Sequence, residues 1–352
     1  MFSNTSANRN RMFLVAGVVV LAFLSLRTGF VFAQPRPKAS YKIGLIAKSE
    51  SNPVFQAARV GAEDAARELG KKYGIEIEIL WRTPAAEDAQ KQAGFIEQLA
   101  VVGVDGLAIS CSDASKVNAA IDKAVDGGVL VACFDSDAPK SKRFVYHGVD
   151  DVECGQEVMK ELAVALGPAG GKIAILAGNQ TAPNLQARVR GVKEELAKHA
   201  SIKLVDVYYH NETPQDAAAK VQEVQTANPD LVGWAMVGGW PLFSDALTNW
   251  TPGKVKIVAV DALPAQLKYV ENGIAQVLLA QRVYDWGHRS VELLIEKLHN
   301  GKAPPAERDI AKLDRVTKEN VAEYGKNWDK WLGKTKDAPT EAKPEPAKTD
   351  KK

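Results

Sequence analysis

Short apolar runs rich in β-branched residues alternate with longer amphipathic segments from Tyr41 to about residue 300. Ten of these runs have the length and composition of β-strands. Such runs, separated by about 10–15 helical residues, are typical of βαβ units with right-handed crossovers. The pattern therefore predicts an α/β fold with parallel strands at 41–47, 75–81, 104–110, 129–134, 143–148, 172–178, 203–209, 231–237, 255–260 and 275–280.

The segments between the runs carry helix signals. In residues 52–70, Asn52 can cap the first turn, and Pro53 suits the first helical position. A helical spacing that would bury one stripe follows at Val54, Ala58, Gly61, Ala65 and Leu69. Residues 183–199 carry a similar stripe at Leu185, Val189, Val192 and Leu196. Both segments are expected to pack on a sheet through these rows.

The strand pattern restarts near the middle of the chain. The run at 41–47 is echoed by GKIAILA at 171–177, and ten strands are many for one twisted open sheet. We therefore predict two similar, doubly wound parallel-sheet lobes, with a boundary near residues 147–151.

The first 33 residues have the layout of a secretory signal. Arg9 and Arg11 precede the apolar stretch MFLVAGVVVLAFLSL, and the small-residue exit VFA lies ahead of Gln34. This stretch is shorter than the about 20 residues that a spanning helix needs. We expect a signal peptide at 1–33 and a mature chain outside the cytoplasmic membrane, in the periplasm; an uncleaved membrane anchor is the alternative.

The other end of the chain, residues 334–352, is composed mainly of Pro, Ala, Lys and Glu without an apolar period. Such a segment buries too little surface to offset its ordering entropy, which predicts a disordered, charged tail.

The overall charge argues against a nucleic-acid partner, and the cysteine spacing indicates the state of the thiols. The 45 basic and 43 acidic side chains give a net charge of +2, which leaves no excess to neutralise a nucleic acid. Cys111, Cys133 and Cys154 are an odd number without C-x-x-C or metal-like spacing. They are expected to be buried free thiols.

Catalytic signatures are absent from the sequence. It contains no G-x-S-x-G elbow, no phosphate-binding loop, no H-E-x-x-H and no G-x-G-x-x-G after a strand. The five histidines are scattered. We therefore expect no enzymatic activity, no cofactor and no metal.

Polar side chains instead follow several predicted strands or open the helices after them. Open parallel sheets bind ligands beyond the carboxyl ends of their strands. Carboxylates accept hydrogen bonds, arginine donates them, and the amides do both, a combination that suits the hydroxyls of a small sugar or polyol. The predicted ligand-binding set is Asn52, Phe55, Asp135, Asn184, Arg188, Trp240, Asp261 and Gln281.

Each of these residues also has a structural interpretation. Asp135 and Asp261 could cap the helices that follow them. Asn184 and Arg188 could form a surface pair on one helix face, and the two aromatic residues could belong to the core. A metal held by Asp135 and Asp137 lacks further oxygen ligands at recognisable spacing.

Four segments resemble the ribose-binding-protein-like branch of the type I periplasmic binding proteins, the sugar receptors of ABC importers. They are SESNPVFQAARVGAEDAARELG, FDSDAPKSKRFVYHGVDD, QTAPNLQARVRGVKEEL and VAVDALPAQLKYVENGIAQVLLAQR, and the similarity covers most of residues 41–300. The resemblance implies ligand-binding roles for Asn52, Phe55, Asp135, Arg188, Asp261 and Gln281.

The sequence departs from that family at three places. Val54 stands where some members have another aromatic residue, Ser136 where ribose receptors have an arginine, and Gly238-Gly239-Trp240 where they carry an asparagine. A sugar or polyol is therefore expected, but not ribose in particular.

The resemblance also implies a periplasmic binding protein-like I fold with a three-segment hinge near 148–151, 281–283 and 308–312. The first lobe would comprise 41–149 and 282–309, and the second 150–281 and 310–333. A ligand bound between the lobes would stabilise closure, and an ABC permease would recognise the closed monomer. Alternatives are a sugar or autoinducer receptor that presents its ligand to a membrane sensor, a transcriptional repressor, and an enzyme on this fold.

Overall fold

The computed structural model describes residues 38–332. The predicted signal segment and the predicted charged tail lie outside these residues. The helices and strands are β1 (Ser40–Ile46), α1 (Pro53–Tyr73), β2 (Glu76–Trp81), α2 (Ala89–Val102), β3 (Gly106–Ile109), α3 (Ala114–Asp126), β4 (Leu130–Phe134), β5 (Val145–Gly148), α4 (Asp151–Leu166), β6 (Gly171–Ala177), α5 (Pro183–Leu196), β7 (Ile202–Tyr209), α6 (Pro214–Ala227), β8 (Leu231–Met236), the 3₁₀ turn η1 (Trp240–Phe243), β9 (Lys256–Val260), α7 (Pro264–Glu271), β10 (Val277–Ala280), α8 (Val283–Asn300), β11 (Arg308–Ile310), β12 (Asp314–Val316), α9 (Val321–Gly325) and α10 (Trp328–Trp331). All ten predicted strands are present.

The strands form two six-stranded sheets with the same connectivity. The first lobe has the order β11-β5-β4-β3-β1-β2, and the second lobe has the order β12-β10-β9-β8-β6-β7. Every pairing is parallel except that of β10 with β12. The shared order confirms the prediction of two similar doubly wound lobes.

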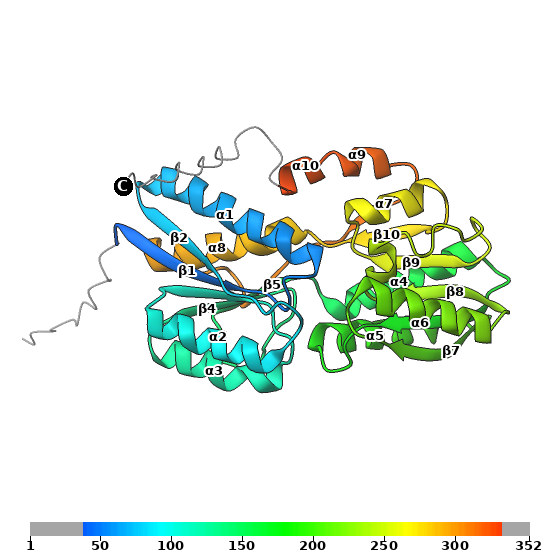
Figure 1. The fold of residues 1–352 in the computed structure, drawn as a ribbon, viewed down its shortest axis with the longest axis horizontal. Helices are drawn as coiled ribbons and strands as arrows, with labels where there is room; N and C mark the ends of the chain where they lie inside the picture. Colours follow the sequence, from blue (N-terminus) through cyan, green and yellow to red (C-terminus); the bar gives the residue numbers. More distant parts are fainter. Residues whose placement is uncertain (1–37, 333–352) are drawn as a thin grey trace, which may run out of the picture. The chain divides into compact units, whose positions relative to one another are not determined.

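Helices cover both faces of each sheet (Figure 1). In the first lobe, α1 and α8 pack on one face, and α2 and α3 on the other. In the second lobe, α4 and α5 pack on one face, and α6 and α7 on the other. The predicted capping of α1 is confirmed, because Asn52 accepts a hydrogen bond from the amide of Val54, and all five residues of its predicted stripe are buried.

Glycines allow one pair of helices in each lobe to pack at very short range. A Cβ atom on Gly287 of α8 would lie 1.8 Å from the carbonyl oxygen of Ala58 in α1. A Cβ atom on Gly155 of α4 would lie 1.9 Å from the carbonyl oxygen of Arg188 in α5. Only hydrogen fits at these contacts, so the glycines set the distance between the paired helices.

The chain passes between the two sheets three times, at 149–150, 281–282 and 311–313. Residues 308–310, which the sequence analysis assigned to a hinge segment, form β11 at the edge of the first sheet. Both β11 and β12 have only three residues and include charged side chains. They therefore lack the apolar run by which the other strands were predicted.

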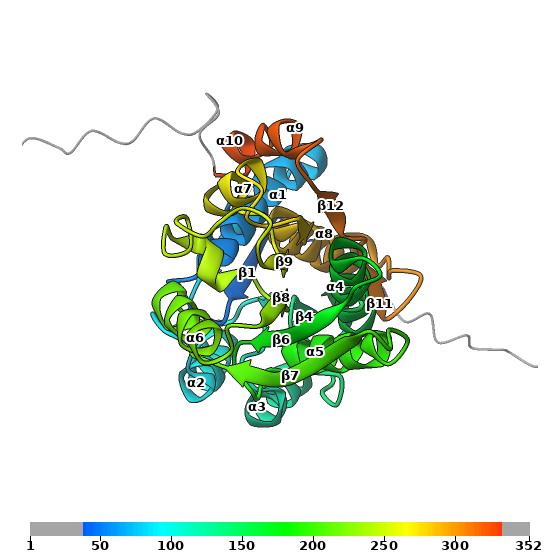
Figure 2. The same ribbon diagram turned by 90° about the vertical axis from the view of Figure 1, so that its right-hand side faces the viewer.

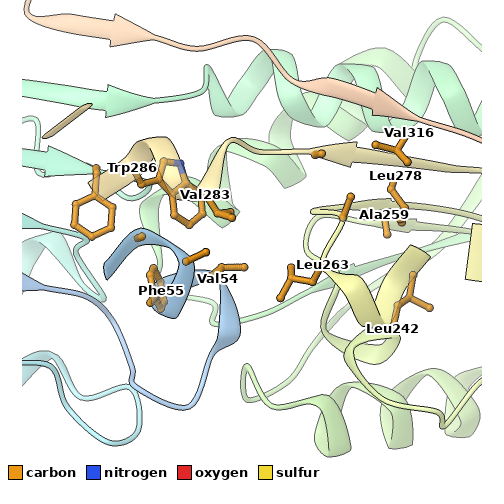
Figure 3. Close-up of a cluster of buried hydrophobic side chains, with 14 of the residues drawn as sticks. Val54, Phe55, Leu242, Ala259, Leu263, Leu278, Val283, Trp286 and Val316 are labelled. Carbon is orange, nitrogen blue, oxygen red and sulfur yellow. The ribbon is translucent and has the colours of Figure 1, made fainter. Parts of the chain in front are cut away.

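One hydrophobic cluster contains residues from both lobes (Figure 3). Phe55 of α1 and Trp286 of α8 belong to it, as do Leu263 and Leu278 of the second lobe. The two lobes therefore share part of their hydrophobic core.

The expectation of buried free thiols is confirmed for Cys111, Cys133 and Cys154.

Candidate functional site

Asp135 lies directly after β4, and its side chain connects the two lobes. Its carboxylate accepts hydrogen bonds from Ser110 Oγ at 2.7 Å and from Asn184 Nδ2 at 3.2 Å. Ser110 follows β3 of the first lobe, whereas Asn184 lies in the first turn of α5 in the second lobe. The Asp135 side chain is 5% exposed, so both bonds are shielded from water.

Arg188 is the central donor of the site. Its guanidinium donates from Nε to Asp151 Oδ1 at 2.9 Å and from Nη2 to Gln281 Oε1 at 2.8 Å. A third bond reaches the carbonyl oxygen of Val237 at 3.1 Å, and Asp135 Oδ1 lies 3.9 Å from Nη2. The guanidinium thus lies near one carboxylate from each lobe and is almost fully buried.

Asp261 is linked to Arg188 through Gln281 on the second lobe. It follows β9, and its Oδ1 accepts a hydrogen bond from Gln281 Nε2 at 2.9 Å. Burial raises the pKa of Asp261 to about 6, although the positive charge of Arg188 opposes the shift. Burial raises the pKa of Asp151 to about 6 in the same way. Hydrogen bonds therefore link Asp261, Gln281 and Arg188, and Arg188 lies beside Asp135.

The structure contradicts two of the structural interpretations, namely helix capping by the two aspartates and a surface pair on α5. Asp135 precedes a loop that leads to β5, and Leu263 is the N-cap of α7, so neither Asp135 nor Asp261 caps a helix. Both have the left-handed backbone conformation, with φ of 56° and 69°, which Asp tolerates better than most residues. Asn184 and Arg188 are 3% and 2% exposed, so they are not a surface pair.

Three residues of the predicted set lie outside this hydrogen-bonded network. Asn52 caps α1. Phe55 is buried in the shared hydrophobic cluster, with its ring 6.1 Å from that of Trp286. Trp240 is buried in the second lobe, with its ring 4.9 Å from that of His210. Ligand contacts by these three residues stay a prediction.

Sequence reasoning missed four further polar residues near the cleft. Lys48 Nζ lies 3.7 Å from Glu212 Oε1, and Asn179 Nδ2 donates to Glu87 Oε1 at 3.1 Å. Lys48 and Glu87 belong to the first lobe, and Asn179 and Glu212 to the second. Lys48 and Glu212 come soon after the ends of β1 and β7, so the strand-end rule applied to every charged residue would have found them.

A cavity of about 690 Å³ lies beside three of these four residues. Glu87, Asn179 and Glu212 line it, together with Ser49 and His210. Burial raises the pKa of Glu87 to about 7, with the negative charge of Glu212 adding to the shift and Lys48 opposing it. Burial lowers the pKa of His210, so this histidine is neutral near pH 7.

Glu87 is expected to make stability depend on pH. Its pKa in the folded chain, about 7, lies above its usual 4.5. Its contribution to stability is therefore fully present below about pH 4.5 and is lost as the pH rises through about 7. Glu87→Gln should reduce the fall in the thermal unfolding midpoint between about pH 5 and about pH 7. Glu97→Gln, an exposed change on α2, serves as the control; equal pH profiles for wild type and Glu87→Gln would contradict the assignment.

The metal interpretation gains no support. Asp137 is held by Arg143, with its two carboxylate oxygens 2.6 and 2.8 Å from the guanidinium. Within residues 38–332, no group of three or more His, Cys, Asp or Glu side chains is placed to hold a metal ion.

Over the same residues, no helix has both the length and the apolar character needed to cross a membrane.

The sequence profile described as "Periplasmic binding protein domain" matches residues 43–303, and the chain belongs to this family. This membership and the observed fold confirm the predicted fold class and the resemblance on which it partly rested. The family is one of binding proteins rather than enzymes.

Two relatives and one solved structure illustrate the similarity. The D-allose-binding periplasmic protein of Escherichia coli (strain K12) is 24% identical over 77% of this chain and 88% of its own length. The D-ribose/D-allose-binding protein of Pseudomonas aeruginosa is 26% identical over 84% and 93%. A solute-binding protein of an ABC transporter from Burkholderia graminis C4D1M, solved in complex with D-arabinose, is 28% identical over 82% and 99%, with a TM-score of 0.75.

Proposed function

We propose that this chain captures a small sugar or polyol between its two lobes and delivers it, chemically unchanged, to an ABC importer. The observation that carries the proposal is the convergence of Asp135, Arg188 and Asp261 from separate strand and helix ends of both lobes. The relatives named for allose and ribose, and the arabinose complex, support the same class of ligand.

The chemistry of the site favours a neutral polyhydroxylated ligand over an anion. Asp135 and Asp261 provide acceptors, Arg188 provides donors, and Asn184 and Gln281 provide both. Each of these groups can exchange a bond to its neighbour for a bond to a ligand hydroxyl. Because the groups belong to both lobes, a ligand that bonds to all of them stabilises the closed arrangement.

A thermal-shift screen tests the proposed ligand class. The chain from Gln34 would be heated with pentoses, hexoses, deoxysugars and inositols, each at the same concentration. A sugar present at 100 times its Kd should stabilise the fold by about 2.7 kcal/mol. Recovery of the ligand unchanged after long incubation, checked by NMR, separates binding from catalysis. If no compound of these classes raises the unfolding midpoint, the proposed ligand class is wrong.

Asp261→Ala should weaken binding of the sugar found in that screen by about 1.5–3 kcal/mol, the range for a hydrogen bond to a charged group. Titration calorimetry measures the change. Asp230→Ala is the matched control, because Asp230 is exposed and pairs with Lys172. Unaltered affinity in Asp261→Ala would exclude this carboxylate from the site.

A further inference from the structure

Two short helices follow the last strand and pack beside the second lobe. Figures 1 and 2 both show α9 and α10 next to α7. The α10 segment also contacts α1 of the first lobe. Trp328, at the start of α10, is 4% exposed and belongs to the hydrophobic cluster shared by the two lobes. Its ring lies edge-on to that of Trp331, with 5.0 Å between the ring centres.

The side chain of Trp328 makes one polar contact, and this contact is with the loop that carries Asp261. The indole Nε1–H donates a hydrogen bond to the carbonyl oxygen of Ala262 at 2.9 Å. Ala262 directly follows Asp261 and is 2% exposed. A buried carbonyl that loses its partner is costly, so this bond restrains the peptide next to the site carboxylate.

The Asp261 amide donates to the carbonyl oxygen of Leu279 in β10 at 2.9 Å, and the side chain of Gln266 of α7 makes two further bonds to the loop. Gln266 Nε2 donates to the carbonyl oxygen of Asp261 at 3.0 Å, and Gln266 Oε1 accepts from the amide of Leu263 at 2.8 Å. None of these bonds reaches the carbonyl of Ala262. The left-handed backbone of Asp261, with φ of 69°, is less favourable for aspartate than for glycine, so the surrounding contacts help to maintain it.

We propose that Trp328 is a positioning residue for the Asp261 carboxylate, acting through the Ala262 carbonyl. The segment after the last strand thereby contributes to ligand binding without contacting the ligand. The effect on sugar affinity rests on the proposed function. The restraint on the loop does not, because it can be measured without a ligand.

Trp328→Phe removes the N–H donor and keeps an aromatic ring in the cluster. We expect sugar affinity to fall roughly 5- to 30-fold, the factor that corresponds to the loss of one or two kcal/mol. Trp331→Phe is the matched control, because Trp331 packs edge-on against Trp328 in the same aromatic group. Its affinity should stay close to that of wild type.

A double-mutant cycle separates positioning from a general structural effect. If Trp328 acts through Asp261, then Trp328→Phe should cost little further affinity in an Asp261→Asn background. The same change should retain its full cost in an Asp135→Asn background, because Asp135 lies on the other lobe. Full additivity with Asp261→Asn, or unchanged affinity in Trp328→Phe, would overturn the inference.

Hydrogen exchange gives a readout that needs no ligand. Trp328→Phe should speed exchange of the amides of Asp261 and Leu263 roughly 5- to 30-fold and leave residues 134–138 unchanged. If wild type binds no sugar, the proposed function fails and this measurement alone decides the inference. Unchanged exchange in the loop, or an equal increase in both regions, would overturn it.

Discussion

Replacing Arg188 with methionine should destabilise the protein by about 3–5 kcal/mol near pH 7, the cost of removing one partner from a buried ion pair. Arg188 is the guanidinium between the carboxylates of Asp151 and Asp135. Without it, both carboxylates stay buried, Asp151 loses its hydrogen-bonded cation, and Asp135 loses the positive charge 3.9 Å away. Binding of any sugar should also be lost, because the central donor of the site is gone.

Urea unfolding of Arg188→Met at two pH values tests this explanation. The deficit in the free energy of unfolding should shrink from about pH 7 to about pH 5, because the buried acids can then take up protons. The direction follows from Asp151 and Asp261, whose pKa values of about 6 are already raised. A raised pKa gives stability that is lost as the pH rises.

Arg190→Met provides the matched control for that experiment. Arg190 lies two residues further along α5, is 59% exposed and faces Glu194 at 3.8 Å. Its replacement should change stability by less than about 1 kcal/mol, as for most surface ion pairs. Equal deficits for the two variants, or a deficit in Arg188→Met that does not vary with pH, would contradict the buried-pair explanation.

Gly155→Ala is expected to cost about 3 kcal/mol or more, at or beyond the upper end for overpacking. The added methyl would lie 1.9 Å from the carbonyl oxygen of Arg188, so α4 and α5 must separate. Because α5 carries both Asn184 and Arg188, the shift should weaken sugar binding as well. Chemical denaturation and calorimetry on the same preparation measure the two effects.

Gly94→Ala is the control for Gly155→Ala. Gly94 also lies inside a helix, but a Cβ atom there would meet no atom within 4 Å. This change should stabilise the protein by about 0.5–1 kcal/mol, since alanine loses less entropy in a helix. A Gly155→Ala protein as stable as wild type would show that the two helices can separate at little cost.

Most of the fold was predictable because parallel strands are buried on both faces. Residues such as those of β3 and β4 therefore read as apolar runs bounded by turn signals. The short β11 and β12 were not predictable in this way, because three residues are too few to show an apolar run or an alternation. Their pairing depends on the path of the chain after α8, and this path is set by tertiary contacts rather than by the local sequence.

The positions of the candidate site residues were predictable where a polar residue ends an apolar run. Asp135, Asp261 and Gln281 were found by that rule, and Arg188 by its place on the following helix. Whether an acid after a strand caps a helix depends on its backbone torsions, which the sequence does not show. The inward direction of Lys48 likewise depends on Glu212, which is 164 residues away along the chain.

The return of the chain to the first sheet affects how the protein can fold during synthesis. Its α8 packs against α1, and β11 completes the edge beside β5. A growing chain therefore cannot complete its earliest-made lobe until about residue 310 has left the ribosome. A fragment ending near residue 150 would expose the apolar face of α1, and the first part of the gene alone would not encode a complete first lobe.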